Sequence, residues 1–82
     1  MIQVTHLYFA FLRERIGTDQ EVVEIPEGST VRSALDWLVS ERGVPLSIQK
    51  ILKVAINQEY ASMDLVLKQG DEIVFITPVA GG

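Results

Sequence analysis

The sequence contains no cysteine, and this absence excludes a disulfide framework, a thiolate zinc site, an iron–sulfur cluster and a catalytic thiol. It also lacks an uninterrupted apolar segment of the length that a membrane span needs, and no basic cluster precedes an apolar run near its start. From these absences we expect a cytoplasmic protein whose fold is stabilised by packing alone.

Basic residues are scarce, with seven Lys and Arg against eleven Asp and Glu. Non-specific binding to nucleic acid or to an anionic membrane needs a basic face, so we expect neither partner. Part of the acidic excess gathers in one segment, and a solvated strand edge is the simplest expectation for it because no histidine lies nearby. The residues are Asp19, Glu21, Glu24 and Glu27.

A chain of 82 residues is one domain that buries only about 60–65% of its unfolded surface. It can therefore hold a compact core but not a deep, enclosed active site. The hydrophobic content of 48% and the charged fraction of 22% indicate a globular domain rather than a disordered one.

Local patterns predict strands in the first third of the chain. β-branched and aromatic residues over 2–9 and alternation over 20–25 are typical of strands, and a short helical turn over 10–16 separates them and ends at Gly17. Neither alternate set of side chains in the first strand is purely apolar, so the pattern does not decide which face of this strand is buried. Residues 46–51 are equally consistent with a loop or one helical turn.

One long helix follows Ser29 and Thr30, which are both suitable N-caps, and runs to about Arg42. Its apolar stripe consists of Val31, Ala34, Leu35, Leu38 and Val39, and Trp37 at the flank is expected to cover a loop. Strands are predicted over 52–56 and 72–77, and the second is apolar enough to be central. The order predicts an α+β fold of the β-grasp type, a mixed sheet of four to five strands packed on one main helix.

Searches for catalytic groups return little. His6 is the only histidine, so a packed or solvated role is expected rather than a metal-binding one. Asp71 and Glu72 are adjacent on a strand and therefore point to opposite faces. The serines lack a nucleophile elbow and the glycines do not form a phosphate loop. We expect no cofactor and no metal bound by this chain.

The end of the chain is the exception. Pro78 removes a ladder donor and should end the last strand, while Val79 and Ala80 are small. Gly81 and Gly82 have no Cβ and can thread a narrow channel in another protein. We therefore predict a β-grasp domain over residues 1–77 and a flexible tail over 78–82, whose terminal carboxylate becomes reactive once it is adenylated. A frayed terminus without a role is the simple alternative.

Along its whole length the chain resembles the small subunits of molybdopterin synthase, which are ubiquitin-like sulfur carriers. The matching pieces are Phe9-Ala10, Leu12-Arg13-Glu14, Gly17-Thr18, the helix after Thr30, Val54-Ala55-Ile56-Asn57-Gln58, residues 67–73 with the turn Gly70-Asp71-Glu72, and Pro78-Val79-Ala80-Gly81-Gly82. The tail is the most specific piece. The family often has a second proline where Thr77 stands and an aromatic residue where Ile76 stands.

The resemblance implies a sulfur-donating subunit rather than a complete catalyst. An E1-like adenylyltransferase, using ATP and Mg²⁺, would adenylate Gly82, and a sulfurtransferase would replace AMP with sulfur. The Gly82 thiocarboxylate, carried on Pro78, Val79, Ala80 and Gly81, would enter the large synthase subunit of a heterotetramer. There it would give sulfur to cyclic pyranopterin monophosphate and build the dithiolene of molybdopterin.

The docking surface follows from the strand period. Ile73 and Phe75 share one face of the last strand, so Val74 and Ile76 face outward if the helix covers the first pair. By resemblance to the family's apolar surface, Tyr60, with Phe9 or Leu7, completes a partner interface.

Three other functions stay open. The same chemistry serves thiamin synthesis or tRNA thiolation, although thiamin carriers are usually shorter and lack the helical stretch before Gly17. A ubiquitin-like modifier would use Gly82 to form isopeptide bonds with lysine. A β-grasp interaction module would leave its terminal glycines unused.

Overall fold

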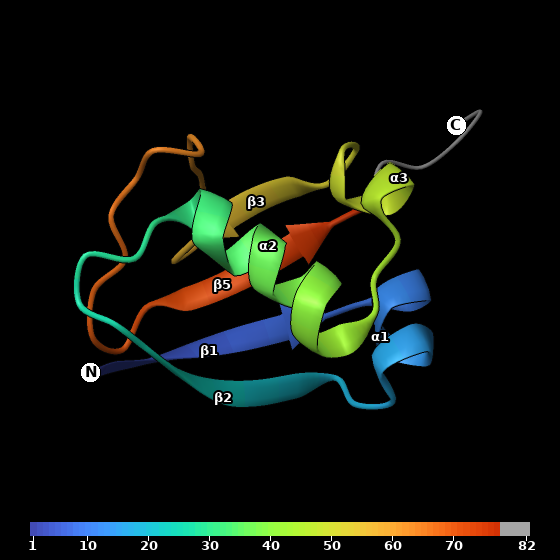
Figure 1. Ribbon diagram of the computed structural model, residues 1–82, viewed down its shortest axis with the longest axis horizontal. Coiled ribbons are helices and arrows are strands. Elements are labelled where there is room, and N and C mark those ends of the chain that lie inside the picture. Colours follow the sequence, from blue (N-terminus) through green and yellow to red (C-terminus); the bar gives the residue numbers. More distant parts are fainter. Residues whose placement is uncertain (78–82) are drawn as a thin grey trace.

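The computed structural model describes residues 1–77, which form one five-stranded sheet with helix α2 lying across one face (Figure 1). The strands are β1 (Ile2–Tyr8), β2 (Gln20–Ile25), β3 (Lys53–Ile56), β4 (Glu59–Tyr60) and β5 (Glu72–Ile76). Their order is β2-β1-β5-β3-β4, with β1 and β5 parallel and the other neighbours antiparallel. The predicted α+β fold and the central position of the last strand are confirmed. The predicted tail, residues 78–82, lies outside the described residues.

Helix α2 (Val31–Arg42) begins and ends where the sequence predicts. The Thr30 hydroxyl accepts from the Ser33 amide, and the Ser33 hydroxyl accepts from the Thr30 amide, so two free N–H groups of the first turn are satisfied. Gly43 ends the helix at φ 66°, a left-handed angle that favours glycine. Val31, Ala34, Leu35 and Leu38 are buried against the sheet, as the apolar stripe predicts.

Two short helices flank the sheet. Helix α1 (Ala10–Ile16) connects β1 to β2, buries Leu12 and ends at Gly17 with φ 94°, as predicted. Helix α3 (Leu46–Gln49) settles the segment that the sequence left open in favour of one helical turn. The structure also adds β4, a two-residue strand that the expected element order did not contain. It is too short to produce a recognisable alternation.

The buried face of β1 carries Ile2, Val4, His6 and Tyr8. His6 is only 1% exposed, so the expectation of a packed histidine is confirmed. This set includes two polar side chains, and their burial requires hydrogen-bond partners. The partners come from β2 and α2, which the sequence of β1 alone does not indicate.

A chain of hydrogen bonds connects these partners. His6 Nδ1 lies 2.9 Å from the Tyr8 hydroxyl, which donates to Glu21 Oε2 at 2.6 Å. Arg42 donates to both oxygens of the same carboxylate, at 3.0 and 2.7 Å, and its guanidinium lies 4.5 Å from the centroid of the Trp37 ring. The expectation of a solvated acidic edge is therefore wrong for Glu21, whose carboxylate accepts hydrogen bonds from Tyr8 on the neighbouring strand and from Arg42 of α2.

Trp37 also departs from expectation. It does not cover a loop but meets the His6 ring edge-on, with centroids 5.2 Å apart. Phe75 contacts the same imidazole from β5 at 4.9 Å. Aromatic rings therefore pack against the only histidine. They exclude water from the imidazole, and this loss of hydration has the largest effect on its pKa.

Burial lowers the pKa of His6 from 6.5 to about 4, the Glu21 carboxylate opposes this shift, and Arg42 adds to it. The hydrogen bond from Arg42 lowers the pKa of Glu21. Burial and the hydrogen bond to Glu21 raise the pKa of the Tyr8 hydroxyl. At neutral pH the imidazole is neutral and the carboxylate is charged.

These pKa values predict a pH dependence of stability. The pKa of His6 is lower in the folded than in the unfolded chain, so the unfolded chain binds a proton first, and stability is lost as pH falls from 6.5 towards 4. Between pH 7 and pH 5 we expect a loss of about 2 kcal/mol from this group. Urea unfolding of the protein and of His6→Phe at both pH values measures it. The substitution should remove the loss, and an equal loss in both proteins would contradict the assignment.

The turn between β3 and β4 offers a second test. Asn57 and Gln58 both have positive φ, 50° and 75°, as a two-residue hairpin of this twist requires. Asn57 tolerates this angle and binds Asp71, but Gln58 is strained. Gln58→Gly should raise the free energy of unfolding by roughly 0.5–1 kcal/mol. Gln20→Gly, at an exposed strand position, is the control and should lower it.

Candidate functional site

An apolar row crosses four strands on the face of the sheet opposite α2. The register pairs Leu7 with Val74, Val74 with Ala55, and Ala55 with Tyr60, so these side chains lie side by side. Ile76 lies on the same face, opposite Lys53. The predicted outward direction of Val74 and Ile76 agrees with the burial pattern of β5, in which only Ile73 and Phe75 are buried.

The edges of this row are more exposed than its middle. Tyr60 is 76% exposed on β4, and Phe9 is 55% exposed just after β1. Phe9 has extended backbone angles, so the alternation of β1 continues through it and places its side chain on the outer face. We call Leu7, Phe9, Tyr60, Val74 and Ile76 the outer patch. Its centre is half-buried by neighbouring side chains, and large apolar groups stand at its rim.

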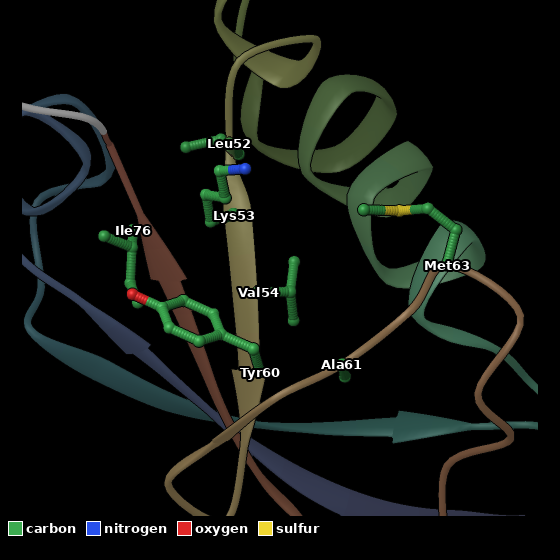
Figure 2. Close-up of a pocket in the computed structure, with 7 residues that line it drawn as sticks. All are labelled: Leu52, Lys53, Val54, Tyr60, Ala61, Met63 and Ile76. Carbon is green, nitrogen blue, oxygen red and sulfur yellow. The ribbon is translucent and has the colours of Figure 1, made fainter.

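A groove of about 620 Å³ adjoins the outer patch along β3. Figure 2 shows the Tyr60 ring reaching across β3 towards Ile76, with Lys53 beside them and Met63 on the side of α2. The groove exists because β4 pairs only with Ala55 and Ile56 and leaves the first half of β3 without a strand neighbour on that side. An apolar groove with one cation at its margin is a surface for binding rather than for chemistry.

Sequence patterns missed part of this surface. Ala55 and Lys53 share the face of Tyr60, a placement that depends on the register between β3 and β5. Met63 comes from the loop after β4 and packs against the core. Its carbonyl accepts a hydrogen bond from the Arg32 amide of α2. The alternation of β3 was the signal that could have found Ala55 and Lys53, but only the pairing of strands shows which strand lies beside them.

The outer patch lies where the chain leaves the sheet. Ile76 is the last residue of β5, and Thr77 follows it towards the predicted tail. The predicted reactive residue, Gly82, and the tail residues Pro78, Val79, Ala80 and Gly81 lie outside the described residues. The predicted interface residues are thus brought together at the end of the strand that leads into these positions.

Within residues 1–77 no three His, Asp or Glu side chains gather in a way that could hold a metal ion. In the same part of the chain, none of the helices is both long and apolar enough to cross a bilayer. What the described residues do show is the outer patch, next to the residue at which β5 ends.

Comparison with known proteins gives the family of this chain. Residues 6–82 match the ThiS family. Two curated molybdopterin synthase sulfur carrier subunits are similar over the whole chain. The one from Drosophila melanogaster is 38% identical over an alignment of 85 positions that covers 100% of this chain and 93% of the relative. The one from Mycobacterium tuberculosis is 37% identical over an alignment of 83 positions that covers 100% of both chains.

Solved structures share the fold. A putative molybdopterin converting factor subunit 1 from Pyrococcus furiosus has a TM-score of 0.84 at 28% identity, covering 96% of this chain and 100% of its own. Small archaeal modifier protein 1 of Haloferax volcanii has a TM-score of 0.81 at 26% identity, with coverage of 96% and 100%.

One further structure, at 22% identity, supports the fold alone. It is a complex of subunits 1 and 2 of the molybdopterin-converting factor from Helicobacter pylori, with a TM-score of 0.58 and coverage of 99% of this chain and 100% of the matched chain. Because the family match includes 77 of the 82 residues, counted from position 6 to position 82, this chain belongs to the ThiS family.

Proposed function

We propose that this chain is the sulfur carrier subunit of a molybdopterin synthase and that its Gly82 carboxylate carries the sulfur. The observation that carries the proposal is the position of the outer patch at the end of β5, directly before the terminal segment. A partner that holds this patch would receive the chain end next to its own surface, which supplies proximity without any catalytic group from this chain.

The chemistry proceeds in three steps on Gly82. A partner adenylyltransferase transfers AMP from ATP to the carboxylate, releasing pyrophosphate, with Mg²⁺ bound to that enzyme. A carboxylate is a poor electrophile, and the mixed anhydride with AMP makes it reactive. The outer sulfur of a persulfide on a sulfurtransferase then attacks the acyl carbon and displaces AMP. A thiol reduces the S–S bond of the resulting acyl disulfide, is itself oxidised to a disulfide, and leaves the Gly82 thiocarboxylate. The large synthase subunit supplies the acid–base groups with which the sulfur passes to cyclic pyranopterin monophosphate.

The names of the curated relatives support the partner assignment, because they are sulfur carrier subunits of molybdopterin synthase. The net charge of −4 favours a partner surface that is somewhat basic. We place these reactions in the cytoplasm.

A ubiquitin-like modifier is the second candidate. The similarity to small archaeal modifier protein 1 favours it, because a modifier and a sulfur carrier need the same fold and the same activated glycine. The two functions differ in the group that attacks the adenylate, a lysine amine or a sulfur donor. The product therefore distinguishes them.

The first prediction concerns Gly82. Incubation of the chain with an E1-like adenylyltransferase, ATP, Mg²⁺ and a sulfurtransferase should replace one terminal oxygen with sulfur, seen as an intact-mass increase. A chain lacking Gly81 and Gly82 is the matched control and should keep its mass. Covalent adducts on lysines of other proteins would favour the modifier. An unchanged mass under conditions that thiolate a known carrier would contradict the proposal.

The second prediction concerns docking. Tyr60→Asp replaces the most exposed aromatic side chain of the outer patch by a charge and should weaken binding to the large subunit by at least roughly tenfold, as expected for an aromatic anchor. Val22→Asp is the matched control, because Val22 is also apolar, 62% exposed and on the outer face, but on β2 at the far edge of the sheet. Calorimetric titration measures both, and equal losses would exclude the outer patch as the interface.

A further inference from the structure

The groove along β3 exists because the chain turns away from this strand after β4. The Ala61 amide still donates to the Val54 carbonyl at 2.9 Å, as a further residue of β4 would. Two residues later the Met63 carbonyl accepts from the Arg32 amide of α2 at 3.0 Å. One wall of the groove is therefore β3, and the other is the segment over residues 61–63, which is bound to α2 (Figure 2). Backbone hydrogen bonds hold both walls in place.

The lining of this groove is apolar except at one position. Leu52 and Val54 are buried at its base, whereas Tyr60 is exposed at its rim. Met63 and Ile76 are half-buried. Because Tyr60 and Ile76 also belong to the outer patch, the groove and the patch form one continuous surface.

Lys53 is the charged position. It is exposed, and its amino group forms no ion pair with a carboxylate of residues 1–77. No Asp or Glu among these residues lines the groove. The local charge is therefore positive on a chain whose net charge is −4. A partner with a basic surface needs a group of the opposite sign at this one place, because like charges at an interface select against binding.

A smaller cavity, of about 250 Å³, lies on the helix side of the sheet, and we call it the His6 cavity after one residue of its lining. Its lining within residues 1–77 includes Trp37 and Leu67 but no Lys, Arg, Asp or Glu. It therefore offers no charge that would select a partner, and the groove does.

We propose that the groove receives an extended apolar segment of the large synthase subunit, and that an Asp or Glu of this segment pairs with Lys53. The identity of the partner rests on the proposed function. A volume of about 620 Å³ is enough for several side chains of such a segment. Lys53 is then a specificity-determining residue, since its charge distinguishes an acidic segment from a neutral or basic one.

Other occupants fit less well. A basic segment would bring its cation to Lys53, where no carboxylate of the described residues lines the groove to balance it. A nucleic acid would meet one cation on a chain that is acidic overall. A second copy of this chain carries the same net charge of −4, so the two copies repel each other.

The test is a calorimetric titration of the large subunit with three variants of the full chain. Lys53→Met keeps the aliphatic stem and should weaken binding about threefold, the usual effect of one exposed ion pair. Lys53→Glu replaces attraction by repulsion and should weaken binding about tenfold. Lys68→Glu, at an exposed residue in the turn before β5, makes the same change in net charge and should not weaken binding. Equal affinities of Lys53→Glu and Lys68→Glu would overturn the proposal.

Salt separates charge from packing. The difference in affinity between the unsubstituted chain and Lys53→Glu should shrink between about 0.1 M and 1 M salt, because the ions screen the pair. A difference that stays constant would mean that the substitution acts through packing, and it would contradict the role given to the charge.

Occupancy of the groove is measured on the unsubstituted chain with ¹³C-methyl methionine. Met63 and Met1 are its only methionines, and Met1 lies before β1, at the opposite end of that strand from the outer patch. The large subunit should shift the Met63 methyl signal and leave that of Met1 in place. Binding without a shift at Met63 would exclude the groove as the contact.

The other occupants give different results in the same spectra. A Met63 shift that depends on the concentration of the free chain would place a second copy in the groove. A Met63 shift caused by removal of residues 78–82 from the free chain would place the end of the chain itself there. Either result would overturn the proposal. Thiolation of Gly82, seen by mass, needs no large subunit and so tests the proposed sulfur-carrier chemistry separately.

Discussion

The position of β5 between β1 and β3 determines the rest of the structure. Parallel pairing with β1 on one side and antiparallel pairing with β3 on the other holds this strand at the centre. Its alternation then sends Ile73 and Phe75 into the core beneath α2, and Val74 and Ile76 to the outer patch. One five-residue strand therefore provides two core residues, two residues of the outer patch and the point where the chain leaves the sheet. A shift of one residue in the register of β5 would exchange its two faces and disrupt both the core beneath α2 and the outer patch.

The buried polar chain from His6 to Arg42 is a second constraint, and it has a cost. A core of apolar side chains alone would avoid the desolvation that lowers the pKa of the imidazole. Tyr8 and Glu21 compensate by satisfying Nδ1 and the hydroxyl, and the charge of Glu21 is balanced by Arg42 at the surface end. Nε2 is left without a partner among residues 1–77. The same arrangement that fixes the buried face of β1 thus leaves one buried ring nitrogen unsatisfied.

Local patterns in the sequence were sufficient where structure depends on nearby residues. The cap at Thr30, the end at Gly43 and the alternation of β5 were all predictable, because helix caps and strand period are short-range effects. The buried face of β1 was not predictable, because the burial of its polar side chains depends on hydrogen bonds that involve Glu21 and Arg42, which are distant in sequence. Residues of the groove beside β3 were missed for the same reason: they depend on which strands pair. The outward direction of Val74 and Ile76 was predictable from the alternation of β5, and the partner interface itself stays a prediction.

The proposed location of the chemistry on Gly82 agrees with the lack of cysteine in the sequence. A carrier that holds sulfur on a terminal carboxylate needs no cysteine, and a sheet with one open apolar face is enough to present that carboxylate to a partner. The outer patch and the His6 cavity lie on opposite faces of the sheet. Successive residues of β1 and of β5 serve one face and then the other. Substitutions that tune docking can therefore leave the core unchanged.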